Sequence, residues 1–197
     1  LKVTATEILK NRALLLFLLS YFFYIEGVNT TIKMAVDYGL SIGLESGDMI
    51  KALLLVQFVA FPFALVFGWI GQRFGATTGI FICIGVYLGN SIFAHVLSTA
   101  THFFIMAALI GMVQGGIQAL SRSHFSALVP IDRTGPYFGF FNMLGRFSSI
   151  VGPALIGLVS LLTGSARSSI YVLILFFALG LVLLWAHRQF INSPSPN

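Results

Sequence analysis

Long apolar stretches and short polar connections alternate along the chain. Each apolar stretch is close to the length of about 20 residues that an α-helix needs to cross the hydrocarbon core of a bilayer. The pattern therefore predicts an all-α membrane protein with six transmembrane helices, at residues 13–36, 52–70, 77–97, 103–125, 137–162 and 170–186. We expect residues 1–12 to form an amphipathic or linker lead-in, 13–188 the six-span domain and 189–197 a flexible tail.

The composition agrees with a membrane protein and argues against other classes. Hydrophobic residues make up 57% of the chain and charged residues 9%, whereas a soluble domain has about 25% charged residues. With so apolar a chain, the net charge of +5 does not indicate nucleic-acid binding, and we expect the lipid bilayer as the partner. The single cysteine and four scattered histidines offer no metal-ligand spacing, and no paired acids or nucleophile–base set is present. We therefore expect no metal, no cofactor and no enzyme activity.

Polar side chains follow one face of the first predicted span. Glu26, Asn29 and Lys33 are three and four residues apart, which places them on the same side of a helix. An ionisable group inside a span costs about 3 kcal/mol on insertion scales and usually faces a cavity or a partner. We interpret these residues as binding a solute or an ion. A structural pair between Glu26 and Lys33 is the alternative.

The fourth predicted span carries a second polar face. Gln114, Gln118 and Arg122 are four residues apart. The two glutamines are candidate hydrogen-bonding groups for a solute. Arg122 falls near the membrane edge, where a gating role and an interface anchor are both open. The spacing Gly111-x-x-x-Gly115 in the same span predicts close approach of another helix backbone.

The fifth predicted span contains the strongest single candidate. Arg146 lies about 13 Å into the span at about 1.5 Å per residue, a depth at which an arginine should face water, a solute or a carboxylate. Asn142 precedes it by four residues, on the same face. A bridge to Glu26 is the structural alternative. Gly152-Pro153 predicts a bend that could serve as a hinge.

The distribution of polar residues over the spans repeats. Spans one, two, four and five hold polar residues, with Gln57 in the second, whereas spans three and six are almost purely apolar. This three-plus-three pattern predicts two inverted three-helix repeats, the architecture of one half of a major facilitator transporter.

Basic residues predict the orientation. Six spans place both termini on one side, which also carries Lys2, Lys10, Arg12, Arg73, Arg122, Arg133 and Arg188. The other side carries Lys33, Lys51 and Arg167. Seven basic residues against three predict cytoplasmic termini under the positive-inside rule, and we expect a bacterial inner membrane.

Several motifs resemble those of a known family. Residues 68–75 (GWIGQRFG) are similar to the major facilitator loop signature, although Gln72 stands where that signature has an acidic residue. Residues 24–30 (YIEGVNT), 115–123 (GGIQALSRS) and 138–148 (FGFFNMLGRFS) resemble the vacuole-effluxer-like branch of the major facilitator superfamily. Fungal members of that branch are associated with autophagy and with amino-acid export from the vacuole.

The resemblance covers nearly the whole chain, but only the second half of a 12-span transporter. The chain begins at Leu1, and we expect a fragment that is completed by a missing N-terminal six-span half or by a second copy. Gly71, Arg73 and Gly75 would form a cytoplasmic hinge turn.

These observations lead to one function hypothesis and one rival. The first is half of a secondary transporter that moves a small polar or zwitterionic solute, such as an amino acid for efflux, by alternating access, with Glu26 as the proton-linked or cation-linked carboxylate. Its expected solute- or ion-binding residues are Glu26, Asn29, Lys33, Gln57, Gln114, Gln118, Asn142 and Arg146. Its gating and hinge residues are Gly71, Arg73, Gly75, Arg122, Gly152 and Pro153. The rival is a membrane scaffold or regulatory module that transports nothing.

Overall fold

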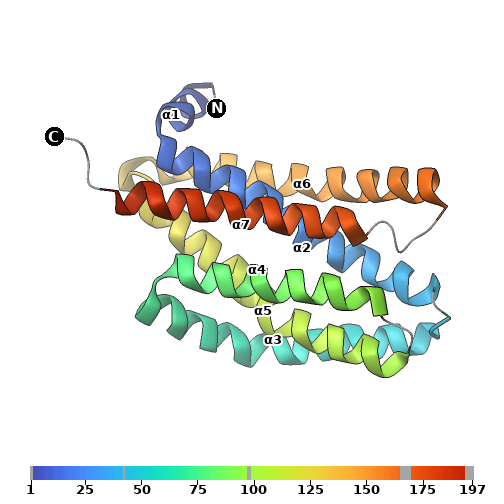
Figure 1. The fold of residues 1–197 in the computed structure, drawn as a ribbon. Helices are drawn as coiled ribbons and strands as arrows, with labels where there is room; N and C mark the ends of the chain where they lie inside the picture. The colour runs from blue at the N-terminus through green and yellow to red at the C-terminus, as the bar shows by residue number, and fades with distance from the viewer. Residues whose placement is uncertain (1, 42, 97–98, 165–169, 194–197) are drawn as a thin grey trace.

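The chain folds into long helices that lie side by side, with both termini at the same end (Figure 1). The structure is a computed structural model that describes residues 2–41, 43–96, 99–164 and 170–193. Its elements are α1 (Lys2–Lys10), α2 (Arg12–Ser41), α3 (Ser46–Phe74), α4 (Ala76–Phe93), η1 (Ala94–Val96), α5 (Ala100–Leu128), η2 (Ile131–Arg133), α6 (Thr134–Thr163) and α7 (Ile170–Asn192).

Within the described ranges, six helices, α2 to α7, are long and apolar enough to cross a membrane. This confirms the predicted fold class. The ends of the helices differ from the sequence prediction. Residues 37–51 were predicted as a loop, but α2 continues to Ser41 and α3 begins at Ser46. The predicted tail begins as helix, since α7 runs to Asn192, and residues 194–197 lie outside the described part. Polar residues mark where a helix leaves the hydrocarbon, not where its backbone hydrogen bonding stops.

The contacts between the helices show the inverted repeat. The helix α2 packs against α6 and α7, and α5 packs against α3 and α4, while α2 also meets α5 and α4 meets α7. Exchanging α2 with α5, α3 with α6 and α4 with α7 leaves this pattern unchanged. The helices α2 and α5 run in opposite directions (Figure 1), so the two three-helix units are inverted relative to each other, as in half of a major facilitator fold.

The helix α2 lies at the centre of the bundle because its neighbours offer glycines for close approach. A Cβ on Gly180 of α7 would lie 2.8 Å from the Cβ of Tyr24, and a Cβ on Gly27 would lie 2.8 Å from the ring of Phe177. The hydroxyl of Ser20 donates to the carbonyl oxygen of Gly180 at 2.8 Å. The apolar face of α2 is therefore fixed against α7, which leaves its polar face for α6.

The predicted close approach at Gly111 and Gly115 is present between α5 and α3. A Cβ on Gly111 would lie 2.8 Å from the carbonyl oxygen of Val56, and one on Gly115 would lie 3.4 Å from the Cβ of Ala64. Since the nearest atom at Gly111 belongs to the backbone of α3, a side chain there can be accommodated only if the two helices move apart.

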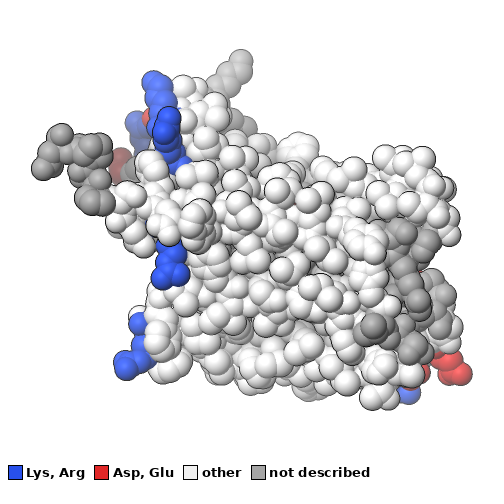
Figure 2. Space-filling model, in the orientation of Figure 1, with Lys and Arg blue, Asp and Glu red and all other residues white. Residues whose placement is uncertain are grey.

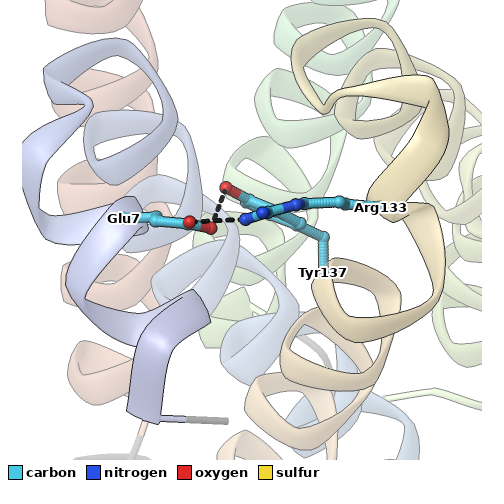
Figure 3. Close-up of polar contacts among 3 residues, drawn as sticks. All are labelled: Glu7, Arg133 and Tyr137. Carbon is cyan, nitrogen blue, oxygen red and sulfur yellow. Dashed lines mark hydrogen bonds and ion pairs between the residues drawn. The ribbon is translucent and has the colours of Figure 1, made fainter.

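The short helix α1 is tied to the start of α6. The carboxylate of Glu7 faces Arg133 and Tyr137, which extend toward it from η2 and from the start of α6 (Figure 3). It pairs with Nη1 of Arg133 at 2.6 Å and accepts a hydrogen bond from the hydroxyl of Tyr137 at 3.1 Å. Solvent screens an ion pair as exposed as this one, so the contact orients α1 more than it stabilises the bundle.

We predict that Gly111→Ala lowers the melting temperature of the purified protein in detergent. The added methyl group meets the Val56 carbonyl, and overpacking of this kind costs about 1–3 kcal/mol. The matched control is Gly85→Ala on α4, where a Cβ meets nothing within 4 Å. Equal melting temperatures for the two variants would contradict the close α3–α5 contact.

Candidate functional site

A pocket of about 370 Å³ lies where α2, α5 and α6 meet. Its size falls within the range of about 300–1,000 Å³ that is usual for small-molecule sites. It is lined by Tyr21, Ile25, Asn29, Gln118, Arg122, Asn142, Gly145 and Arg146. The pocket therefore combines residues of both three-helix repeats.

The four-residue spacing read from the sequence explains how each helix contributes a row of side chains. Residues four apart lie above one another on the same face of a helix. In this way α5 presents Gln118 and Arg122, and α6 presents Asn142 and Arg146, to one pocket. These four side chains are exposed, so a solute that enters the pocket can reach them.

The residues Asn142 and Arg146 also border a second hollow, which is shared with Gly139, Met143 and Phe147 of α6. They therefore lie on a ridge between two open spaces. Asn142 and Arg146 can therefore contact a solute in the first pocket. They can also contact a further protein segment that packs against α6 at the second hollow.

The residue Asn29 sets the distance between α2 and α6. Its side-chain nitrogen donates to the carbonyl oxygen of Gly145 at 3.4 Å and to the hydroxyl oxygen of Ser148 at 3.2 Å. A Cβ on Gly145 would lie 2.9 Å from the hydroxyl oxygen of Tyr21. The absence of a side chain at Gly145 therefore lets α2 approach α6 closely. The hydrogen bonds of Asn29 then join the two helices beside the pocket.

The carboxylate of Glu26 is fully buried, with 0% of its surface exposed, and is not among the residues that line the pocket. Its Oε1 accepts hydrogen bonds from the backbone N–H of Gly152 and from the hydroxyl of Thr30, the latter at 3.3 Å. Its Oε2 is buried and has no hydrogen-bond partner. The bond from Gly152 therefore joins α6 directly to Glu26 of α2. Burying a carboxylate without hydrogen bonds is costly, and this bond offsets part of that cost.

Besides Glu26, three further predicted solute-binding residues lie outside the pocket lining. Gln114 borders a small apolar cavity of about 50 Å³ between α2, α3 and α5, where its Oε1 has no hydrogen-bond partner. Gln57 of α3 and Lys33 of α2 are exposed away from the pocket lining. Their roles in binding remain predictions that rest on the sequence pattern.

The predicted hinge residues also separate. The expected glycine-rich turn is mostly helix, because α3 runs to Phe74 and includes Gly71 and Arg73. Gly75 alone lies between α3 and α4, with a φ of 87° that favours glycine. In contrast, Arg122, predicted near the membrane edge, lines the pocket.

The predicted bend at Gly152-Pro153 lies inside α6, which continues to Thr163. Gly152 is buried against α2, where a Cβ would overlap with Oγ1 of Thr30 and Oε1 of Glu26. The glycine is required there for close packing. Its hinge role remains a prediction.

Sequence reasoning missed Tyr21, Ile25 and Gly145 as lining residues. The ring of Tyr21 is held by stacking on Phe141, with ring centroids 4.0 Å apart. A signal for the α2–α6 contact was present in the sequence, since Gly145, Ser148 and Gly152 are spaced i, i+3 and i+7 on α6. In the described part of the chain, no group of three or more His, Cys, Asp or Glu residues is placed to hold a metal ion.

Comparisons with known proteins show relatives of this chain. The chain is 42% identical over 181 residues to the uncharacterized MFS-type transporter YxiO of Bacillus subtilis, covering 92% of this chain and 42% of that protein. It is 42% identical over 73 residues to Autophagy-related protein 22 of Eremothecium gossypii, covering 37% of this chain and 14% of that protein. The chain thus spans less than half the length of these relatives.

A solved structure shares the fold. The crystal structure of an auto inhibited POT family peptide transporter superposes with a TM-score of 0.76 at 19% identity, covering 95% of this chain and 39% of that one. Residues 1–189 match the family described as vacuole effluxer Atg22 like. A match over almost the whole chain shows the family, and the protein therefore belongs to the Atg22-like vacuole effluxers.

Proposed function

We propose that this chain is one half of a secondary transporter for a small polar solute, and that the pocket between α2, α5 and α6 is its part of the translocation path. The observation that carries the proposal is the polar lining of this pocket, from helices of both repeats, in an otherwise apolar bundle. Membership of an effluxer family and the fold of a major facilitator half support it. Alternating access would move this half against its partner half.

An amino acid is our candidate solute. Its carboxylate suits the guanidinium of Arg146, which can donate two parallel hydrogen bonds. The side-chain amides of Gln118 and Asn142 supply neutral donors and acceptors in the same pocket. The family description, which names these proteins effluxers, makes export the favoured direction.

We further propose that Glu26 couples transport to protons. It is a fully buried carboxylate, with one oxygen on the Gly152 amide and the other without a hydrogen-bond partner. Binding of a proton changes the charge on a group that joins α2 to α6. Because both helices also form the pocket, the protonation state of Glu26 would be linked to the shape of the solute site.

The activity requires more than this chain. The chain corresponds to 42% of the length of its Bacillus relative. We propose that a further six-span half, or a second copy of this one, provides the facing wall of the path. The exposed pocket residues would then line a space between the two halves.

The charges at the two ends of the bundle support an orientation with cytoplasmic termini. Basic residues gather at the end that carries the termini, and acidic residues are prominent at the opposite end (Figure 2). The first set includes Lys10, Arg12, Arg73, Arg133 and Arg188, and the second Asp37, Glu45 and Asp48. We propose that the basic end faces the cytoplasm of a bacterial cell.

We expect Glu26→Gln to abolish proton-driven flux. The measurement is uptake of labelled amino acids by proteoliposomes of the full-length transporter under an imposed pH gradient. The control is Glu45→Gln, a change at an exposed carboxylate beside α3, which should leave flux unchanged. Full gradient-dependent flux in Glu26→Gln would refute the coupling role. Absence of any flux from inserted, folded wild-type protein would favour a non-transporting scaffold.

The change Gly152→Ala should reduce both flux and melting temperature. Its Cβ overlaps with Thr30 and Glu26, so α2 and α6 must separate, at a cost of about 1–3 kcal/mol. The matched control on the same helix is Gly157→Ala, where a Cβ meets nothing within 4 Å. If the two variants behave alike, the α2–α6 contact does not control transport.

Thiol labelling tests the orientation. The native Cys83 is buried and should react slowly. A membrane-impermeant maleimide added to intact cells should label Ser46→Cys but not Ser193→Cys, since these exposed positions lie at opposite ends of the bundle. Labelling of Ser193→Cys alone would reverse the proposed topology.

A further inference from the structure

The described lining of the α2–α5–α6 pocket carries charge of one sign only. Arg122 and Arg146 both line it, and none of the other lining residues is acidic. Arginine stays protonated at all physiological pH values. The other polar side chains that line the pocket carry neutral amides and the hydroxyl of Tyr21. A hollow lined by one sign of charge concentrates ions of the opposite sign.

The two arginines come from different repeats and different depths. Arg122 lies six residues before the end of α5 at Leu128, and Arg146 lies twelve residues after the start of α6 at Thr134. Both of these helix ends are on the side of the termini, so Arg122 is the outer and Arg146 the inner cation of the same pocket. An anion that enters from that side therefore meets Arg122 first.

The buried carboxylate of Glu26 lies at the α2–α6 contact and not in the pocket lining. Its Oε1 accepts a hydrogen bond from the amide of Gly152. A solute ammonium group would thus find no carboxylate among the described residues of this pocket. A solute carboxylate or phosphate would find two guanidinium groups, each of which can bind such a group through paired hydrogen bonds.

We infer that this half binds the oxyanion group of the solute, a carboxylate or a phosphate, through Arg122 and Arg146, and that an ammonium group contributes nothing to binding here. The inference rests on the proposed transport function and narrows its substrate class. It makes the oxyanion the required element of the solute, and it assigns recognition of any positive group to the facing half. It also gives Arg122 a binding role in place of a membrane-edge anchor.

The test compares ligands that differ in one group. The melting temperature of the full-length transporter is measured with alanine, with propionate, which lacks the amino group, with alaninamide, which lacks the carboxylate, and with inorganic phosphate. We expect propionate or phosphate to stabilise the protein and alaninamide to stabilise it less than either, since its ammonium group can contact only the facing half. Stabilisation by propionate identifies a carboxylate site, and stabilisation by phosphate identifies a phosphate site. The inference is overturned if alaninamide stabilises the protein as much as either oxyanion does. It is also overturned if neither propionate nor phosphate stabilises the protein.

Variants connect the effect to the pocket. Arg122→Gln and Arg146→Gln should each weaken the apparent affinity for the oxyanion by about tenfold or more, the loss of a charge-assisted hydrogen bond. The lysine variants at both positions should keep part of the binding, because they keep the charge. The control Arg73→Gln removes an exposed arginine of α3 outside the pocket and should change nothing. Equal affinities in Arg122→Gln and wild type would overturn the role of Arg122.

The outcome is separable from the proposed transport function. Flux that persists with alaninamide and is insensitive to Arg122→Gln would leave the transporter intact as a hypothesis and reject the oxyanion site. Oxyanion binding that needs both arginines, without flux of any tested solute, would support the site and reject the transport proposal.

Discussion

The contact between the Glu26 carboxylate and the backbone amide of Gly152 is the constraint on which the functional region depends. It requires α2 and α6 to lie so close that position 152 has no room for a Cβ. The same proximity lets Asn29 reach the Gly145 carbonyl, and it fixes how wide the pocket can be. Burying a carboxylate in an apolar interior costs free energy. This cost is the reason that we propose a functional role for Glu26 and not a purely structural one.

Both repeats use glycines to bring helices close to a central helix. Around α2, the neighbours contribute Gly145 and Gly152 of α6 and Gly180 of α7. Around α5, the central helix presents Gly111 and Gly115 to α3, and Gly71 of α3 and Gly79 of α4 lie against Leu120 of α5. Of the two equivalent contacts, α2–α6 and α5–α3, the first carries the carboxylate of Glu26, bonded to the Gly152 amide. The hydrogen bonds described between α5 and α3 include no such group, so the architecture is symmetric in its contacts but asymmetric in the position of the proposed proton switch.

Sequence reasoning reached the fold because the fold depends on period and length. Apolar stretches of membrane length and a polar, polar, apolar order were enough to predict six spans and the inverted repeat. It also predicted that Gln118, Asn142 and Arg146 belong to a site, because four-residue spacing fixes a helix face. Which faces meet is decided by packing between distant segments, so Gln57 and Gln114 could not be separated from the pocket residues. The burial of Glu26 behind the pocket lining could not be predicted either, because its partner Gly152 lies more than a hundred residues away in the sequence.

The link between α3 and α4 has a consequence for how the chain is made. Gly75 is the sole residue between the two helices, and its backbone has a φ of 87° at the point where the chain reverses direction. A link of one residue keeps the end of α3 and the start of α4 adjacent while the chain is inserted. We therefore expect the second and third spans to enter the membrane together, as a helical hairpin.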